Sequence, residues 1–175
     1  MDNQIEESNL LVIREIQNRD AARFIELNRQ IDLETKNMLL EPQERTTTLD
    51  QQEAIINKIE SRKNQVIFIA EKDLKIVGFT VASGGDFVRN RQTASLVIGV
   101  RCSWWGMGIG RSLLNAIRQW AMNNSIHRLE LTVRTDNSRA VSLYKSIGFV
   151  VEGRRVESLF VDGNYVDEYY MAMHV

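Results

Sequence analysis

The sequence predicts a mixed α/β domain, in which helices flank a largely antiparallel sheet of about six to seven strands. Two observations support this fold class. Apolar residues alternate with period two at 66–71 and 76–83, which is typical of paired strands. Between 93 and 156, apolar runs then alternate with segments of helical periodicity, which indicates strand–helix–strand units.

The elements before this central region follow from capping and breaking residues. Alternating apolar residues at 11–16 predict a first strand. Asn18 or Asp20 can cap the helix that follows, because their short side chains accept hydrogen bonds from the first turn. The polar segment 34–47 contains Pro42, the only proline, and is predicted to be a loop or a broken helix.

The middle of the chain begins with a second helix and continues into strands. Thr48 and Gln51 have the spacing of a capping box, and isoleucines follow at helical spacing. The two strands at 66–71 and 76–83 are joined by a short polar turn. A third apolar run at 93–100 has the composition of a central strand.

The last third of the chain alternates helices and strands. Apolar residues at helical spacing predict a helix over 109–121, and period two returns at 129–134. Asn137 can cap a short helix that Gly148 ends, and a strand at 149–156 follows. Two final strands, 159–161 and 165–173, flank a hairpin turn at Asp162-Gly163-Asn164.

Length and composition limit the class of protein. A chain of 175 residues is predicted to be one domain, 1–175, long enough to bury a core without disulfides or metal. The formal net charge of −1 gives no global positive field for nucleic acid or anionic lipid, so neither is expected as a partner. Cys102 is the only cysteine and cannot supply a cysteine cluster for zinc, and no metal is expected.

No membrane segment is expected either. The longest uncharged run, 76–85, is too short to cross a bilayer. The N-terminus opens with Asp2, Glu6 and Glu7, without a basic flank and an apolar run, so it does not resemble a signal peptide. We therefore expect a cytoplasmic protein.

A glycine cluster lies between the strand at 93–100 and the helix at 109–121. Gly106, Gly108 and Gly110 let the backbone turn sharply and approach a ligand, and the helix start adds free N–H donors. Together these predict a phosphate or pyrophosphate site. The spacing fits neither a Walker loop, because Arg111 follows the last glycine, nor a G-x-G-x-x-G dinucleotide fingerprint.

A second motif, downstream of the glycine loop, narrows the interpretation of that loop. Asn137-Ser138-Arg139-Ala140-Val141-Ser142-Leu143-Tyr144, with Gly148-Phe149 after it, has the form N-x-x-A-x-x-L-Y-x-x-x-G-F. With the glycine loop, this resembles the GNAT superfamily of acyl-CoA-dependent N-acetyltransferases over nearly the whole chain. Glu152-Gly153, followed by the stretches 161–165 and 168–171, is similar to the branch that includes spermidine and ribosomal-protein N-terminal acetyltransferases.

The resemblance implies acetyl-CoA as co-substrate and direct attack of an amine on its thioester. Backbone N–H groups from Trp105 to Arg111 would hold the pyrophosphate. The strand ending at Val100 would pair with the pantetheine, with Gly99 allowing a kink or bulge. The implied cofactor-binding residues are Ile98, Gly99, Val100, Trp105, Gly106, Met107, Gly108, Ile109, Gly110, Arg111, Asn137, Ala140 and Tyr144.

Two residues are expected to take part in the reaction itself. The backbone N–H of Ile98 is the implied oxyanion donor, and Tyr144 the implied acid that protonates the leaving thiolate. The alternative for Tyr144 is a helix aromatic packed on the sheet, and Asn137 can be both a pantetheine ligand and a helix cap. Trp105 departs from the Gln or Arg usual at its position in the family, and Arg111 or Arg101 can replace that contact.

The acceptor is left open as a small amine, an amino acid or polyamine, or a protein N-terminus. Glu34 and Glu41 fall where the family places its acceptor-lining segment, so they are candidate substrate-binding residues. The alternative is a solvated acidic loop. The resemblance also suggests a homodimer through the C-terminal strands. A non-catalytic acyl-CoA sensor is the alternative function, since it needs the cofactor site but no acid.

Overall fold

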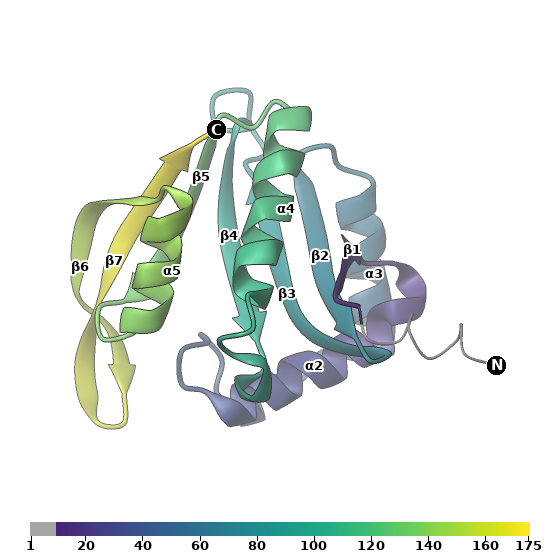
Figure 1. Ribbon diagram of the computed structural model, residues 1–175, viewed down its shortest axis with the longest axis horizontal. Coiled ribbons are helices and arrows are strands. Elements are labelled where there is room, and N and C mark those ends of the chain that lie inside the picture. The colour runs from purple at the N-terminus through teal and green to yellow at the C-terminus, as the bar shows by residue number, and fades with distance from the viewer. Residues whose placement is uncertain (1–9) are drawn as a thin grey trace.

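The computed structural model describes residues 10–175, and these residues form a single seven-stranded sheet in the order β1-β2-β3-β4-β5-β7-β6 (Figure 1). The only parallel pair is β4 with β5, and all the other neighbours are antiparallel. The predicted fold class is therefore confirmed. The strands are β1 (Val12–Glu15), β2 (Gln65–Lys72), β3 (Lys75–Gly84), β4 (Thr93–Val100), β5 (Arg128–Arg134), β6 (Val150–Val161) and β7 (Asn164–His174).

Helices cover both faces of the sheet. In Figure 1, α4 and α5 lie in front of the strands and α2 and α3 lie behind them. On the rear face, Phe24 and Ile31 of α2 and Ile56 of α3 pack against β2 and β3. On the front face α4 packs against β2, β3 and β4, with its Leu114 and Ile117 buried in the core. The helices are α2 (Ala21–Glu34), α3 (Leu49–Glu60), α4 (Ile109–Asn123) and α5 (Ser138–Ile147).

The expected side-chain cap at the start of α2 is wrong. Asp20 lies at its N-cap position, but its carboxylate accepts a hydrogen bond from Gln17 N and pairs with Arg14 and Arg23.

Three other predicted helix ends are confirmed. Thr48 and Gln51 form the reciprocal capping box at the start of α3. Asn137 accepts a hydrogen bond from the backbone N–H of Ala140 at 3.2 Å and so caps α5. Gly148 ends α5 with a φ of 118°, a left-handed conformation that L side chains rarely adopt.

The prediction of two separate strands at 149–156 and 159–161 is wrong. They form one strand, β6, because a bulge lets the chain continue along β7. Arg155 pairs with Glu168, while Leu159 pairs with Val166, so four steps along β6 match only two along β7. Extra residues of this kind leave the ladder locally unpaired and re-aim neighbouring side chains, a feature that the period of the sequence does not show.

The parallel pair β4–β5 is short, and this shapes the site. Its register joins only Thr93, Ala94 and Ser95 to residues 128–130. Beyond these residues the two strands are not paired, although β4 stays paired with β3 as far as Val100. Alternate backbone groups of β4 therefore point away from β3 with no strand to receive them.

The N-terminal expectation concerns residues 1–9, which lie outside the described residues. In the part from 10 to 175, no helix is both long and apolar enough to span a bilayer.

Candidate active site

A cavity of about 780 Å³ opens where β4 and β5 separate. One end is formed by the glycine loop, the start of α4 and the facing side of α5. The other end is formed by the carboxyl end of β5, the bulged part of the β6–β7 hairpin and the segment after α2. The cavity is thus bounded by α2 and the segment after it and by elements from β4 to β7, and its two ends differ in chemistry.

At the first end the ligand-facing groups belong to the backbone. Gly106 and Gly108 both have a φ of 79°, and a Cβ added to either would contact nothing within 4 Å. The N–H groups of Gly106 to Arg111 donate to no backbone oxygen of residues 10–175, whereas Ser112 N donates to Gly108 O at 3.0 Å. A helix start with free donors and a positive dipole end suits an anion. Trp105 departs from this expectation, because its N–H donates to Cys102 O at 3.2 Å.

Gly110 lies where two helices pack closely together. A Cβ there would lie 2.9 Å from Cδ2 of Leu143 in α5, a distance that real Cβ atoms do not show. The glycine therefore brings the start of α4 against α5, so that the loop and the Asn137–Tyr144 segment border the same cavity.

The tryptophan of the loop has a structural role. Trp105 Nε1 donates to Val100 O at 2.7 Å, which ties the loop to the end of β4. The Arg139 guanidinium lies over the Trp105 ring, 4.7 Å from its centroid, a cation–π geometry. Arg139 lines the cavity and is a cation that sequence reasoning missed.

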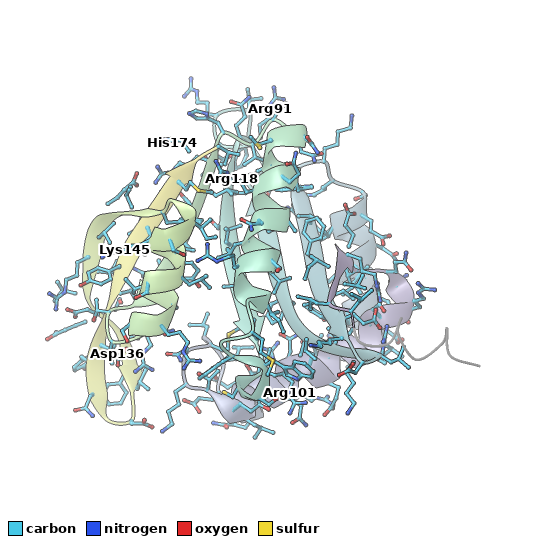
Figure 2. All side chains as sticks on the ribbon, in the orientation of Figure 1. Arg91, Arg101, Arg118, Asp136, Lys145 and His174 are labelled. Carbon is cyan, nitrogen blue, oxygen red and sulfur yellow. The ribbon has the colours of Figure 1, made fainter. Side chains whose placement is uncertain are left out.

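Of the two arginines suggested in place of the usual Gln or Arg, only Arg111 reaches the cavity. Arg101 donates instead to Glu34, with Nη2 to Oε1 at 2.6 Å and Nε to Oε1 at 3.0 Å. Figure 2 shows Arg101 beneath the start of α4, where it joins the loop region to the end of α2.

The β4 side of the cavity consists of Leu96 to Val100 and includes Ile98, as expected. The kink or bulge expected at Gly99 is absent, since the β3–β4 register runs unbroken through Phe79↔Gly99. A Cβ at Gly99 would lie 2.7 Å from Cε1 of Phe79. The glycine therefore makes room for a core ring on the opposite face of the sheet.

Tyr144 lines the cavity from α5, as do Asn137 and Ala140 near the N-terminal end of the same helix. Its ring is buried in the core beside Phe149, at a centroid distance of 5.9 Å. The two sequence readings, a packed aromatic and a cavity-facing phenol, are therefore compatible. Burial raises the pKa of Tyr144 well above its usual value, so the side chain is a neutral phenol at physiological pH.

The structure does not bring Glu34 or Glu41 to the cavity wall. Burial disfavours the Glu34 carboxylate, but hydrogen bonds from Arg101 and from Cys102 N at 2.8 Å outweigh this and lower its pKa. Glu41 is exposed and caps the short 3-10 helix Pro42–Glu44. Both side chains organise the segment after α2.

That segment is anchored at several points and borders the second end of the cavity. Arg45 pairs with the buried carboxylate of Asp32. Arg134 Nη1 donates to Lys36 O at 2.8 Å, and Lys36 Nζ lies 2.5 Å from Oδ2 of Asp162 in the hairpin turn. These contacts hold residues 35–39 against the end of β5 and the β6–β7 hairpin.

The second end also carries charged side chains that sequence reasoning missed. Arg155, Ser158 and Glu168 line the cavity from the bulged hairpin. Their only sequence signal is the broken alternation after 156, which we read as a gap between strands. No group of three or more His, Cys, Asp or Glu that could hold a metal is found within residues 10–175.

The comparisons with known proteins agree with this geometry. The model of the acetyltransferase (GNAT) family matches residues 28–149, which include β4, the glycine loop and all of α5. The chain belongs to the GNAT acetyltransferase family. The resemblance stated from the loop and the Asn137–Tyr144 segment is therefore confirmed.

Individual relatives of this GNAT chain extend the comparison. It is 33% identical to the L-amino acid N-acetyltransferase AaaT of Escherichia coli over 57% of this chain and 62% of that protein. It is 38% identical to the spermidine N(1)-acetyltransferase of Vibrio cholerae over 35% and 36% of the two chains. The chain thus spans less than two thirds of these curated relatives. A crystal structure of a GNAT acetyltransferase from Streptococcus pneumoniae superimposes with a TM-score of 0.92 and 32% identity, covering 95% of this chain and 100% of that one.

Proposed function

We propose that this protein is an acetyl-CoA-dependent N-acetyltransferase that moves an acetyl group to a primary amine. The observation that carries the proposal is the convergence of three features on one cavity: a glycine-lined helix start, an unpaired edge of β4 and the phenol of Tyr144. Acetyl-CoA, when bound, supplies the activated acyl group as a thioester.

The residues at the loop end fit the cofactor. Free N–H groups from Gly106 to Arg111 suit a pyrophosphate, and Arg111 and Arg139 add positive charge beside them. The unpaired backbone groups of β4 between Leu96 and Val100 suit the amides of a pantetheine arm, which would pair with them as a further strand does.

The reaction is a direct transfer in which bonds and protons balance. The amine nitrogen bonds to the carbonyl carbon, the carbon–sulfur bond breaks, the nitrogen loses a proton and the sulfur gains one. The N–H of Ile98 would stabilise the negative charge that develops on the carbonyl oxygen; such donors contribute about 2.7–4 kcal/mol in hydrolases.

The environment of Tyr144 bears on its role in that transfer. Burial raises the pKa of the phenol, which keeps its proton in place but makes a free tyrosinate costly. We therefore assign Tyr144 to donation of its O–H proton to the departing sulfur. The phenol would then take up a proton from solvent, to which the amine nitrogen has lost one, so that the protons balance.

The domain organisation, cellular compartment and oligomeric state expected from the sequence also form part of this proposal. We propose that the chain acts as one catalytic domain in the cytoplasm, and as a homodimer through the C-terminal hairpin. The support for the dimer is apolar exposure on the edge strand β6, where Val156 is 70% and Phe160 66% exposed. Light scattering coupled to gel filtration gives the mass directly, and a monomer at micromolar concentration would overturn the dimer.

The activity itself is tested by following free-thiol release from acetyl-CoA against amino acids, polyamines, aminoglycosides and short peptides. Release that depends on one amine class is the expected result. Thermal stabilisation by acetyl-CoA without transfer to any amine or protein N-terminus would instead identify an acyl-CoA sensor. No stabilisation and no transfer would overturn the cofactor assignment.

A further inference from the structure

We propose that the second end of the cavity binds a small acceptor that carries both an amine and a carboxylate, as α-amino acids do. Glu168 would hold the ammonium group and Arg155 the carboxylate. This inference rests on the proposed function, and it names the substrate class that the same site selects.

The bulge in β6 creates this pair of charges. Arg155 Nη1 and Ser158 Oγ each lie 2.9 Å from Oε2 of Glu168, although the two residues are three positions apart on one strand. Only the shift in register lets both side chains reach the same carboxylate. Asp167 holds the bulge from the neighbouring strand by accepting a hydrogen bond from Glu157 N at 2.7 Å.

Both Glu168 and Arg155 have polar atoms that remain available to bind a ligand. The Glu168 side chain is 10% exposed, and both of its hydrogen bonds from described residues reach Oε2, which leaves Oε1 available. The Arg155 side chain is 53% exposed and uses only Nη1 within the described chain. A zwitterion can therefore meet the pair with opposite charges matched, its ammonium on Glu168 and its carboxylate on the free guanidinium edge.

Arg134 also lines this end of the cavity, but three of its N–H groups already donate hydrogen bonds to other residues. Its Nε and Nη2 donate to Asp136, at 3.0 and 2.7 Å, and its Nη1 donates to Lys36 O. Arg155 therefore has more free N–H groups to offer an acceptor than Arg134, three of whose N–H groups are already engaged.

The charge of the cavity argues against a polyamine. Arg111 and Arg139 lie at the cofactor end, so the charged lining residues of the second end are Arg134, Arg155 and Glu168, two cations and a single anion. A polycation would need several carboxylates, and the arginines would repel it. An acceptor with one amine and one carboxylate meets no such repulsion.

The segment after α2 favours a small molecule over a long peptide, because it lies along one side of this end of the cavity. Residues 35–39 cross from α2 to the hairpin, held by the Lys36–Asp162 ion pair and by Arg134. Asn37, Met38 and Leu39 line the cavity from that segment, and Leu159 lines it from β6. An extended chain would have to displace these contacts.

The test compares matched acceptors that differ only in the carboxylate. A panel of L-amino acids, their amides and their decarboxylated amines is assayed for thiol release with acetyl-CoA. We expect kcat/KM to be about 10- to 100-fold higher for the acids, the range that one hydrogen bond to a charged group contributes. Spermidine is expected to fall below the acids.

Two variants separate the proposed role of Arg155 in carboxylate binding from that of Glu168 in ammonium binding. Arg155→Gln should lower kcat/KM at least tenfold more for the acids than for the decarboxylated amines, because only the acids have a carboxylate to place on that side chain. Glu168→Gln should lower both, because both carry an ammonium group. Arg154→Gln is the matched control: its side chain pairs with Asp167, is 61% exposed and does not line the cavity.

Binding of the same acceptors in the presence of CoA, measured by calorimetry, distinguishes a failure of the proposed acceptor site from a failure of the proposed acetyltransferase activity. If the wild-type protein binds the acids more tightly and Arg155→Gln abolishes this preference, the acceptor site is supported even where no acetyl transfer occurs. In that case only the proposed acetyltransferase activity would be wrong. Transfer that favours amines over acids, or an equal loss for both in Arg155→Gln, overturns the acceptor site and leaves the transferase intact.

Discussion

The two ends of the cavity are built in opposite ways. The cofactor end is built around consecutive residues, 106–111, whose backbone N–H groups donate to no backbone oxygen of residues 10–175. The acceptor end consists of side chains from β5, β6, β7 and the segment after α2. Backbone donors are the same for any side chain that tolerates the turn, so they suit a ligand common to a family. Side chains can be exchanged without altering the fold, so they suit a ligand that varies.

The reacting centre lies between these ends and should show the largest effect. Tyr144→Phe removes one oxygen and keeps the buried ring, so the fold should be retained. We expect kcat to fall about 10²–10⁴-fold, the range for a positioned acid, with acetyl-CoA affinity unchanged. Steady-state kinetics with the best amine of the panel provides the measurement. An unchanged kcat would remove Tyr144 from the mechanism.

The pH dependence of the same pair of proteins sharpens the assignment. An acid must be protonated, so its contribution is present below its pKa and is lost as the pH rises through it. Because burial raises the pKa of Tyr144 above the usual value of about 10, the rate ratio of wild type to Tyr144→Phe should stay level up to about pH 10. A ratio that falls between pH 7 and 9 would contradict this.

At the cofactor end, the backbone conformation itself can be tested. Gly108→Ala places a Cβ at a φ of 79° in the loop, which costs about 1–2 kcal/mol and shifts the N–H donors. We expect acetyl-CoA affinity, measured by calorimetry, to fall about tenfold. Gly163→Ala is the matched control, since Gly163 has the same φ of 79° in the distant hairpin turn.

Both glycine variants should lose similar thermal stability, but only Gly108→Ala should lose affinity for acetyl-CoA. An equal loss of affinity in both would mean that global strain, not the loop, controls binding. Neither variant is expected to alter the discrimination between amino acids and decarboxylated amines.

The smallest effect is expected for an exposed cation at the cofactor end. Arg111→Gln should weaken acetyl-CoA binding about two- to fivefold at low salt, and the difference should shrink at 0.5 M salt, because exposed charges are screened. Arg118→Gln is the control on the same helix, and Figure 2 shows Arg118 toward the far end of α4. Affinities measured at two ionic strengths decide the matter, and a salt-independent loss would argue against a charge effect.

The sequence predicted much of the fold because most of its signals are local. The capping box at Thr48, the cap at Asn137 and the end of α5 at Gly148 were read correctly, since a few neighbouring residues determine each of them. The continuous β6 was missed, because a bulge depends on pairing with β7 and disturbs the alternation of its own strand. Gly99 was misread for a similar reason: the Phe79 ring that it accommodates comes from another strand.

The cofactor end of the site could likewise be read from a contiguous motif, whereas the acceptor end could not. Glu34 and Glu41 were chosen because they are acidic and lie in the expected segment, but Arg101 and a helix cap engage them instead. Glu168 had no local signal, since its partners Arg155 and Ser158 reach it only across the hairpin.

By itself, the sequence determined the family, the fold class and the glycine loop with its free donors, because consecutive residues fix turns, caps and helix starts. The tertiary structure alone decided which charges meet at the acceptor end. That outcome depends on the separation of β4 from β5 and on the register of β6 against β7. Strand pairing joins residues far apart in the chain, and a shift in register changes which side chains face the cavity.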